Sequence, residues 1–380
     1  MTEPSVIDAV ELLPRYVESA LLHTVRDTHR AIAARVHGLV NLATADVARP
    51  VELAHRGIAE AVYASIGVGL RAAGTGARFA QDSGVRGGSL DSSGGRALRA
   101  AVNGLLGDEL RADGSPMALG MTIRLRGEDV PVHPPGLANA FPQAQPRIVV
   151  LLHGLGENDQ HWNARRDIVG TSYPEILELL GWTPVVLRYN SGLSVRENGV
   201  ALASLIQSLV EAWPTDVRRI AMIGHSMGGL VVRASCAVAT DAKRPWPERL
   251  SDVVTLGTPH LGADLAKLVQ VGSRLLARVP ETSAFSRFLD HRSVGIDDLS
   301  DGLPDLTPSP RVRYHLVAAT LGDSPRHPLG DILVRMPSAY GRRRRRQLFP
   351  QADVLHLPRT DHFGLLNHHD VHLALKEWLS

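Results

Sequence analysis

From about residue 117 to its end, the chain alternates short apolar runs with segments whose apolar residues recur at helical spacing. Near-continuous apolar runs of this length are typical of strands buried on both faces of a parallel sheet. Strands that alternate with helices predict an α/β fold, a mostly parallel twisted sheet with helices on both faces. The predicted strands are Arg147–Leu152, Pro184–Arg188, Arg219–Ile223, Asp252–Leu256, Arg313–Ala318 and Val354–Leu357, and helices are predicted at about 174–181, at about 196–212 and from about Val371.

The first part of the chain has a different pattern. Apolar side chains at three- and four-residue steps predict a helix within residues 5–48. Residues 67–96 are rich in glycine and serine, as loops and linkers are, and helical spacing resumes at Arg96–Leu110. We therefore predict a helical N-terminal extension over residues 1–116 and a catalytic domain over 117–380, which opens on a strand pair in MTIRLRGEDVPV. What the extension binds is left open.

A long segment separates two of the predicted strands, Asp252–Leu256 and Arg313–Ala318. It exceeds what a simple connection needs, and it follows the carboxyl end of a parallel strand, where sites form. We predict that residues 261–310 form a helical cap insertion, which would give the site an apolar wall. The apolar residues at helical spacing are Leu261, Leu265, Leu268, Leu275 and Leu276.

Residues 224–228 read GHSMG and follow the predicted strand Arg219–Ile223 directly, with helical spacing after them. Strand, G-x-S-x-G and helix in this order are the context of a nucleophile elbow. The two glycines lack a Cβ where such a turn brings backbone segments close together. The turn would present the Ser226 hydroxyl and leave the Met227 N–H free at a helix N-terminus, where it can stabilise an oxyanion.

A serine hydroxyl needs a neighbouring imidazole to take its proton, and the imidazole needs a carboxylate to orient it. On this fold the order along the chain is Ser, Asp, His. Asp331 and Asp323 both follow the strand Arg313–Ala318 and qualify as the acid. His362, in the loop after the last predicted strand, is the best-placed histidine, with His356, His368 and His369 as rivals.

Other residues near these motifs could contribute to the site or to packing. The turn after RIVVLL offers the Leu155 N–H as the second oxyanion donor. Substrate contact and plain packing are equally compatible with His260 and with Trp162. His153 is expected to be structural, and His225, at the variable position of the elbow, is expected to point away from the nucleophile and to have no chemical role.

The segments LLHGLG, GHSMGG, LGTPHLG, GDILV and DHFGLL, in this order and spacing, resemble bacterial esterases and lipases of the α/β-hydrolase superfamily. The branch they resemble is that of the lipases similar to GPI-inositol deacylases, and the resemblance covers about residues 117–380. It implies that Ser226 is the nucleophile, His362 the base and Asp331 the acid. It also implies that the amides of Leu155 and Met227 form the oxyanion hole.

The chain departs from this family pattern at one motif. Family members commonly read G-D-G-L-V-P around the acid, whereas this chain has Ile332 and Arg335 at the glycine and proline positions. The aspartate itself is retained. Between the two candidate acids, Asp331 is favoured because the Ile-Leu-Val run after it can anchor its loop, whereas Asp323, next to Ser324 and Pro325, resembles an exposed turn.

Composition narrows the reading only a little. With 380 residues and 44% hydrophobic residues, the chain can bury a large core. The net charge of +2 gives no reason to expect a nucleic acid partner, and the arginine run 342–346 is expected to be a solvated loop, with peripheral membrane contact left open. No signal peptide and no transmembrane segment are expected, which predicts a cytoplasmic location. The lone Cys236 excludes an internal disulfide framework.

The predicted function is a serine carboxylic-ester hydrolase that acts on small-molecule or lipid esters with a hydrophobic part. This chemistry needs no metal and no organic cofactor. An acyltransferase or thioesterase would use the same triad, and a non-catalytic binding protein of the same fold is the alternative from another class. The oligomeric state is left open.

Overall fold

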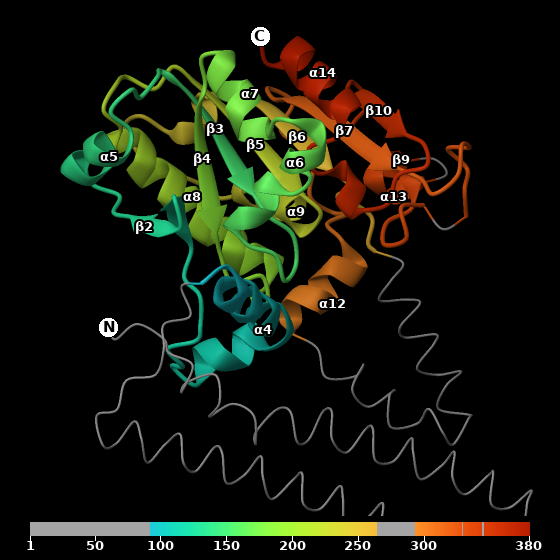
Figure 1. The fold of residues 1–380 in the computed structure, drawn as a ribbon, viewed down its shortest axis with the longest axis horizontal. Coiled ribbons are helices and arrows are strands. Elements are labelled where there is room, and N and C mark those ends of the chain that lie inside the picture. Colours follow the sequence, from blue (N-terminus) through green and yellow to red (C-terminus); the bar gives the residue numbers. More distant parts are fainter. Residues whose placement is uncertain (1–91, 264–292, 329, 344–345) are drawn as a thin grey trace, which may run out of the picture. The chain divides into compact units, whose positions relative to one another are not determined.

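The computed structural model describes residues 92–263, 293–328, 330–343 and 346–380 (Figure 1). Residues 96–266 and 293–380 form one compact unit, and the account below concerns its described part. The helix predicted within residues 5–48 lies outside the described residues, as does most of the predicted cap, including Leu265, Leu268, Leu275 and Leu276.

The core of this unit is an eight-stranded sheet in the order β10-β7-β6-β5-β3-β4-β1-β2 (Figure 1). The strands β4, β3, β5, β6, β7 and β10 run parallel, and β1 pairs antiparallel with both β4 and β2. The mostly parallel sheet predicted from the apolar runs is therefore confirmed. The bounds are β1 Thr122–Leu125, β2 Glu128–Val130, β3 Arg147–Leu152, β4 Thr183–Arg188, β5 Arg219–His225, β6 Leu250–Leu256, β7 Arg313–Ala319 and β10 Asp353–Leu357.

Helices cover both faces of the sheet, because each central strand sends alternate apolar side chains to opposite faces. Along β3, Ile148, Val150 and Leu152 belong to one buried cluster, which includes Leu202 of α8 and Leu230 of α9. Val149 and Leu151 belong to a second cluster with Leu177 of α7 and Leu375 of α14. The helices are α4 Ser93–Ala112, α5 Pro134–Ala140, α6 Arg166–Val169, α7 Tyr173–Leu179, α8 Val195–Ala212, α9 Met227–Ser235, α12 Val294–Asp301, α13 Met336–Ala339 and α14 His369–Trp378.

Short 3₁₀ turns and one small hairpin complete the described elements. The 3₁₀ turns are η2 Asp159–Asn163, η3 Trp246–Glu248 and η5 Phe363–Leu365. The hairpin pairs β8 Arg342–Arg343 with β9 Arg346–Gln347, which include three arginines of the run. Arg342 and Arg343 are exposed, as expected for a solvated segment, and the Arg342 guanidinium lies 5.8 Å from the ring centre of Tyr340.

The strand order places the loops after β3 and β5 side by side. The chain leaves β3 toward β4 on one side and returns to β5 on the other, which makes this the switch point of the sheet. At the carboxyl ends of β3 and β5, Leu152 lies opposite Gly224. The turn after Leu152 and the GHSMG turn, which starts at Gly224, therefore begin next to each other at the carboxyl edge of the sheet.

Helix α4 belongs to the same compact unit as the sheet, so the boundary predicted at residue 116 falls inside that unit. Its glycines let it approach the loops at the carboxyl edge closely. A Cβ added to Gly104 would lie 2.8 Å from the Cα of Gly156, and Asn190 Nδ2 donates a hydrogen bond to the carbonyl of Gly107 over 2.8 Å. The sequence analysis placed this helix in the extension, whereas its packing joins it to the loops of the sheet.

The described end of the predicted cap, α12, also contacts these loops and α4. Ser293 Oγ donates to the carbonyl of Gly104 over 2.7 Å, and Asp298 Oδ2 accepts from the Val195 N–H at the start of α8 over 2.7 Å. Ser293 and Gly295 are buried, since both face backbone of neighbouring loops.

Candidate active site

Ser226 occupies a sharp turn between the end of β5 and the start of α9. Its backbone has φ 51° and ψ −120°, in the region of positive φ that a residue with a Cβ adopts only when its surroundings hold it there. A Cβ on Gly224 would lie 2.3 Å from the Gly229 nitrogen, and one on Gly228 would lie 2.4 Å from the Leu152 carbonyl oxygen. The predicted close approach at both glycines is therefore present.

The backbone of Ser226 is held from the neighbouring strand as well as from its own helix. Its N–H donates to the carbonyl of Leu256 over 2.8 Å, and its carbonyl accepts from the Thr258 hydroxyl over 2.9 Å. Both partners come from the end of β6, in the segment LGTPH. These contacts fix the strained turn from outside, as a residue with such a φ angle requires.

His362 and Asp331 form a buried hydrogen-bonded pair at the same edge of the sheet. The distance from His362 Nδ1 to Asp331 Oδ2 is 2.7 Å, and the two residues are 2% and 1% exposed. The His362 N–H also donates to the Asp331 carbonyl over 3.0 Å. The other ring nitrogen of His362, Nε2, is buried and has no hydrogen-bond partner among the described residues.

The loop of Asp331 turns its carboxylate inward through backbone hydrogen bonds. Asp331 Oδ1 accepts from the N–H groups of Leu333 and Val334, over 3.0 and 2.7 Å. Val334 is 2% exposed and anchors the loop in the core, whereas Ile332 is half exposed and has a φ of 91°. The expected anchoring by the Ile-Leu-Val run thus applies to Val334 and not to Ile332, which occupies a backbone conformation suited to glycine.

The rival residues lie in other surroundings. Asp323 is exposed and forms an ion pair with Arg359 at 3.0 Å. His356 Nε2 lies 2.7 Å from the hydroxyl of Thr320, and His368 caps the N-terminus of α14. Among the candidate acids and bases, the structure brings Asp331 and His362 together.

The turn after β3 lies against the serine. A Cβ on Gly154 would be 3.1 Å from the Ser226 Cβ. Within this turn, the Gly154 N–H donates to Glu157 Oε2 over 2.7 Å and the Gly156 N–H to Ser191 Oγ over 2.9 Å. The N–H groups of Leu155 and Met227, which the sequence singled out as oxyanion donors, make no hydrogen bond with any other described residue.

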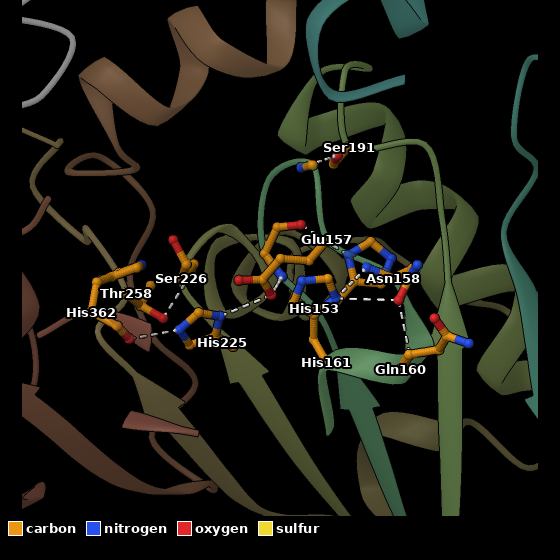
Figure 2. A network of polar contacts seen from close by, with 12 residues as sticks. His153, Glu157, Asn158, Gln160, His161, Ser191, His225, Ser226, Thr258 and His362 are labelled. Carbon is orange, nitrogen blue, oxygen red and sulfur yellow. Dashed lines mark hydrogen bonds and ion pairs between the residues drawn. The ribbon is translucent and has the colours of Figure 1, made fainter. Parts of the chain in front are cut away.

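Glu157 and His225 form a second buried pair, which the sequence analysis missed (Figure 2). Glu157 Oε2 lies 2.9 Å from His225 Nδ1, and His225 Nε2 lies 3.2 Å from the carbonyl oxygen of His362. The rings of His225 and His362 are 4.9 Å apart between their centres. His225 therefore has a partner on each ring nitrogen, contrary to the expectation that it takes no part in the site. The position of Glu157, three residues after Gly154, was the one feature of the sequence that could have indicated this pair.

Of the two possibilities left open for His260 and Trp162, the structure shows both side chains packed between neighbouring elements. His260 is fully buried, its ring nitrogens are 3.3 Å from Arg233 Nη1 and from Thr255 Oγ1, and burial lowers its pKa well below the usual value. Trp162 is 1% exposed and belongs to the cluster that covers one face of the sheet. Both side chains are enclosed because they join neighbouring elements.

His153 has the structural role expected for it. Its ring stacks on Tyr189 at 4.4 Å between centres, and the Tyr189 hydroxyl donates to the His153 carbonyl over 2.8 Å. Burial lowers the pKa of His153 to about 4, so the ring is neutral at ordinary pH. It fixes the start of the turn without a charge of its own.

In the described part of the chain, no cluster of histidine, cysteine, aspartate and glutamate side chains has a composition suited to holding a metal ion. None of the described helices is both long enough and apolar enough to cross a membrane.

Comparison with known proteins adds a family model to this geometry. Residues 142–305 match the model described as "Putative serine esterase (DUF676)", a range that contains Ser226 and ends before Asp331 and His362. The strand order, the strained serine turn and this match agree. The described part of the chain has an α/β-hydrolase fold, and residues 142–305 are similar to a serine esterase family.

Curated relatives match a shorter part of the chain. A triacylglycerol lipase from Pseudarthrobacter phenanthrenivorans is 32% identical over 127 residues, which is 32% of this chain and 36% of that protein. A triacylglycerol lipase from Burkholderia plantarii is 32% identical over 127 residues and is covered to 32% of its length. The chain thus spans about a third of the length of these relatives.

Solved lipase structures also resemble the chain. The mature form of Bacillus licheniformis lipase BlEst2 is 19% identical, with a TM-score of 0.40, and the match covers 63% of this chain and 93% of that chain. The α/β-hydrolase fold follows from the strand order and the serine turn described above.

Proposed function

We propose that the chain is a serine carboxylic-ester hydrolase in which Ser226 is the nucleophile, His362 the general base and Asp331 the acid that orients it. The observation that carries the proposal is the combination of a serine held at φ 51° with a buried His–Asp pair whose outer nitrogen has no hydrogen-bond partner in the described part of the chain. A hydroxyl on such a turn and a free imidazole nitrogen are the two groups that acyl transfer requires.

In the proposed reaction, Ser226 Oγ attacks the ester carbonyl carbon and its proton passes to His362 Nε2. Asp331 accepts the Nδ1–H of His362, which fixes the tautomer and stabilises the imidazolium. The carbon–oxygen bond to the alcohol then breaks, and the alcohol leaves with the proton from Nε2. Water, activated by the same nitrogen, attacks the acyl-enzyme and releases the acid together with free Ser226.

The negative charge on the carbonyl oxygen would rest on the N–H groups of Leu155 and Met227. The neighbouring N–H groups of Gly154 and Gly156 are already bonded within the protein, which leaves these amides as the donors beside Ser226. The Met227 N–H lies at the first position of α9, where the helix dipole adds to the stabilisation of an anion.

For the substrate we propose esters with a hydrophobic acyl or aromatic part. The relatives named triacylglycerol lipase support an ester of this kind, although the match extends over a third of their length. Residues 261–310 are only moderately hydrophobic and contain no long apolar run. We therefore expect soluble esters to be better substrates than emulsified triglycerides.

The experiment is a panel of p-nitrophenyl esters of increasing acyl length, assayed with wild type and with Ser226→Ala. Wild type should hydrolyse the panel, and the variant should lose on the order of 10⁴-fold or more in kcat with an unchanged melting temperature. Product that appears only when a thiol or alcohol acceptor is added would make the protein a transferase. Equal turnover by Ser226→Ala would overturn the assignment, and no turnover by wild type on any ester would favour a binding protein.

A further inference from the structure

The Glu157–His225 pair is a buried charged pair in contact with the proposed machinery on both sides. Glu157 is 4% exposed and His225 is fully buried. Glu157 lies in the turn after β3, and His225 directly precedes Ser226. Figure 2 shows the pair between the turn and His362, with a contact toward each. Burying such a pair is costly unless its remaining hydrogen-bonding groups are satisfied.

On the first side, one carboxylate oxygen serves two donors. Glu157 Oε2 accepts from the Gly154 N–H over 2.7 Å and from His225 Nδ1 over 2.9 Å. The Gly154 bond closes the turn that contains Leu155. The direction of the Leu155 N–H therefore depends on where Glu157 is held.

On the second side, the partner of His225 is a backbone carbonyl. The His362 carbonyl can only accept, so His225 Nε2, 3.2 Å away, donates. Because Nδ1 donates to Glu157 as well, the ring carries both protons and is an imidazolium. Burial alone would lower the pKa of His225, but the Glu157 carboxylate and the His362 carbonyl outweigh it, and the pKa of His225 is raised.

The charge of Glu157 agrees with this arrangement. Burial acts to raise the pKa of Glu157, yet the charge and hydrogen bond of His225 lower it to about 2. Other titratable groups also interact with the pair: His153 and His161 from the segment after β3, Tyr189 after β4, and Asp331 and His362 from the loops after β7 and β10. The Phe363 ring, 6.4 Å from the His225 ring between centres, closes one side.

We propose that Glu157 and His225 are positioning residues for the reaction: as a carboxylate–imidazolium pair, they set the oxyanion turn through the Gly154 N–H and the base through the His362 carbonyl. This inference rests on the proposed function of Ser226 and His362. It requires that His225 keep both protons, since a neutral ring has one N–H and satisfies one side only. The two contacts are then coupled through a single ring.

The test compares Glu157→Gln with His225→Gln by kcat and KM for p-nitrophenyl butyrate from pH 5 to 9. The glutamine at position 157 offers an oxygen to Gly154 but no charge, so His225 should lose its second proton as the pH rises. We expect kcat of this variant to fall by about 10²-fold at pH 8, with a smaller loss at pH 5.5 and a small change in KM. His225→Gln has no group to titrate, so its loss should be the same at both pH values relative to wild type.

The matched control is Asp353→Asn, which removes a carboxylate from a histidine pair at the opposite end of the sheet. Asp353 Oδ2 lies 2.9 Å from His315 Nδ1, and Asp353 is the first residue of β10. This variant should keep wild-type kcat at every pH. Folding of each variant is checked by its thermal transition. If Glu157→Gln does not fold, His225→Gln alone tests the proposal, and wild-type kcat in His225→Gln would overturn it.

A readout independent of turnover separates this inference from the proposed function. Nitrogen NMR of histidine-labelled protein should show the His225 ring doubly protonated at pH 8 in wild type and singly protonated in Glu157→Gln. A neutral His225 in wild type at pH 7, or a Glu157→Gln variant with wild-type kcat at pH 8, would overturn the inference even if Ser226 is the nucleophile. An inactive wild type with a doubly protonated His225 would overturn the positioning role together with the proposed function.

Discussion

Two histidine–carboxylate pairs lie next to each other at the carboxyl edge of the sheet, and they differ in the second nitrogen of the imidazole. Both pairs are buried, with nitrogen–oxygen distances of 2.7 Å for His362–Asp331 and 2.9 Å for His225–Glu157. In the first pair, Nε2 has no hydrogen-bond partner among the described residues. In the second pair, Nε2 donates to the carbonyl of His362.

This difference separates a group that can exchange a proton from a group that holds its neighbours. An imidazole with one free nitrogen can take a proton from a substrate or nucleophile and return it. An imidazole with both nitrogens committed keeps its protons and fixes the groups around it. A histidine close to a serine is therefore not always its general base. Whether the second ring nitrogen is free to exchange a proton decides which histidine can have that role.

The largest effect should come from breaking the first pair. Asp331→Asn removes the carboxylate that orients His362, and we expect kcat to fall by about 10⁴-fold, as loss of a triad acid does when the geometry is kept. The measurement is kcat for p-nitrophenyl butyrate at pH 8. Asp323→Asn is the control, since Asp323 is exposed and pairs with Arg359. If activity is lost in Asp323→Asn and kept in Asp331→Asn, the acid has been wrongly assigned.

Breaking the second pair should lower the free energy of unfolding in a defined pH window. The pKa of Glu157 is lowered to about 2, so the stability it contributes is present above its unfolded value and is lost as the pH falls toward 2. The pKa of His225 is raised, so its contribution is full below about pH 6.5 and is lost as the pH rises through its folded value. The pair is therefore most stabilising between about pH 4.5 and 6.5.

Urea unfolding of wild type and Glu157→Gln at pH 3, 5.5 and 8.5 measures this window. We expect a difference of about 3 kcal/mol at pH 5.5, because one partner of a buried pair has been neutralised. The difference should be smaller at both other pH values. A difference that does not vary with pH would mean that the pair is not charged.

A smaller loss of kcat should follow when a residue of α4 displaces the turn after β3. Gly104→Ala on α4 would place a methyl group 2.8 Å from the Cα of Gly156, so the turn must shift. We expect kcat to fall by about 10-fold, since small displacements of catalytic groups are costly, with a change in stability within ~1 kcal/mol. Gly120→Ala is the control, because a Cβ at Gly120 meets nothing within 4 Å. Unchanged kcat in Gly104→Ala would show that α4 does not constrain the turn.

The smallest effect concerns the loop of the first pair. Ile332 has a φ of 91°, a conformation in which a β-branched residue is strained. Ile332→Gly should raise the free energy of unfolding by ~1 kcal/mol, the strain relieved being larger than the entropy that glycine adds to the unfolded chain. Ile332→Ala retains a Cβ and should give less gain. Chemical unfolding of the three proteins makes the comparison.

The sequence predicted what depends on local pattern and on the order of motifs. Each parallel strand follows from a near-continuous apolar run, and the turn at Ser226 follows from two glycines flanking it between a strand and a helix. The pairing of Asp331 with His362 could be anticipated because the order of the two along the chain is characteristic of this fold.

Other features depend on contacts between distant segments that no local pattern encodes. Glu157 and His225 are 68 residues apart, and His225 reaches a carbonyl 137 residues further on, so the pair becomes visible only when three loops meet. The packing of α4 was missed for a similar reason. Its glycines at 104 and 107 weaken a helix locally, and their value lies in close approach to the turn and to Asn190.

The central claim is that Ser226 is a nucleophile activated by His362, and stoichiometric labelling with a fluorophosphonate tests it most directly. Wild type should take up one label per chain, located on Ser226 by peptide mass spectrometry, and Ser226→Ala should take up none. His362→Ala should fold and label at least 10³-fold more slowly, since the serine then lacks its base. A label on another residue, or equal labelling rates in wild type and His362→Ala, would contradict the account.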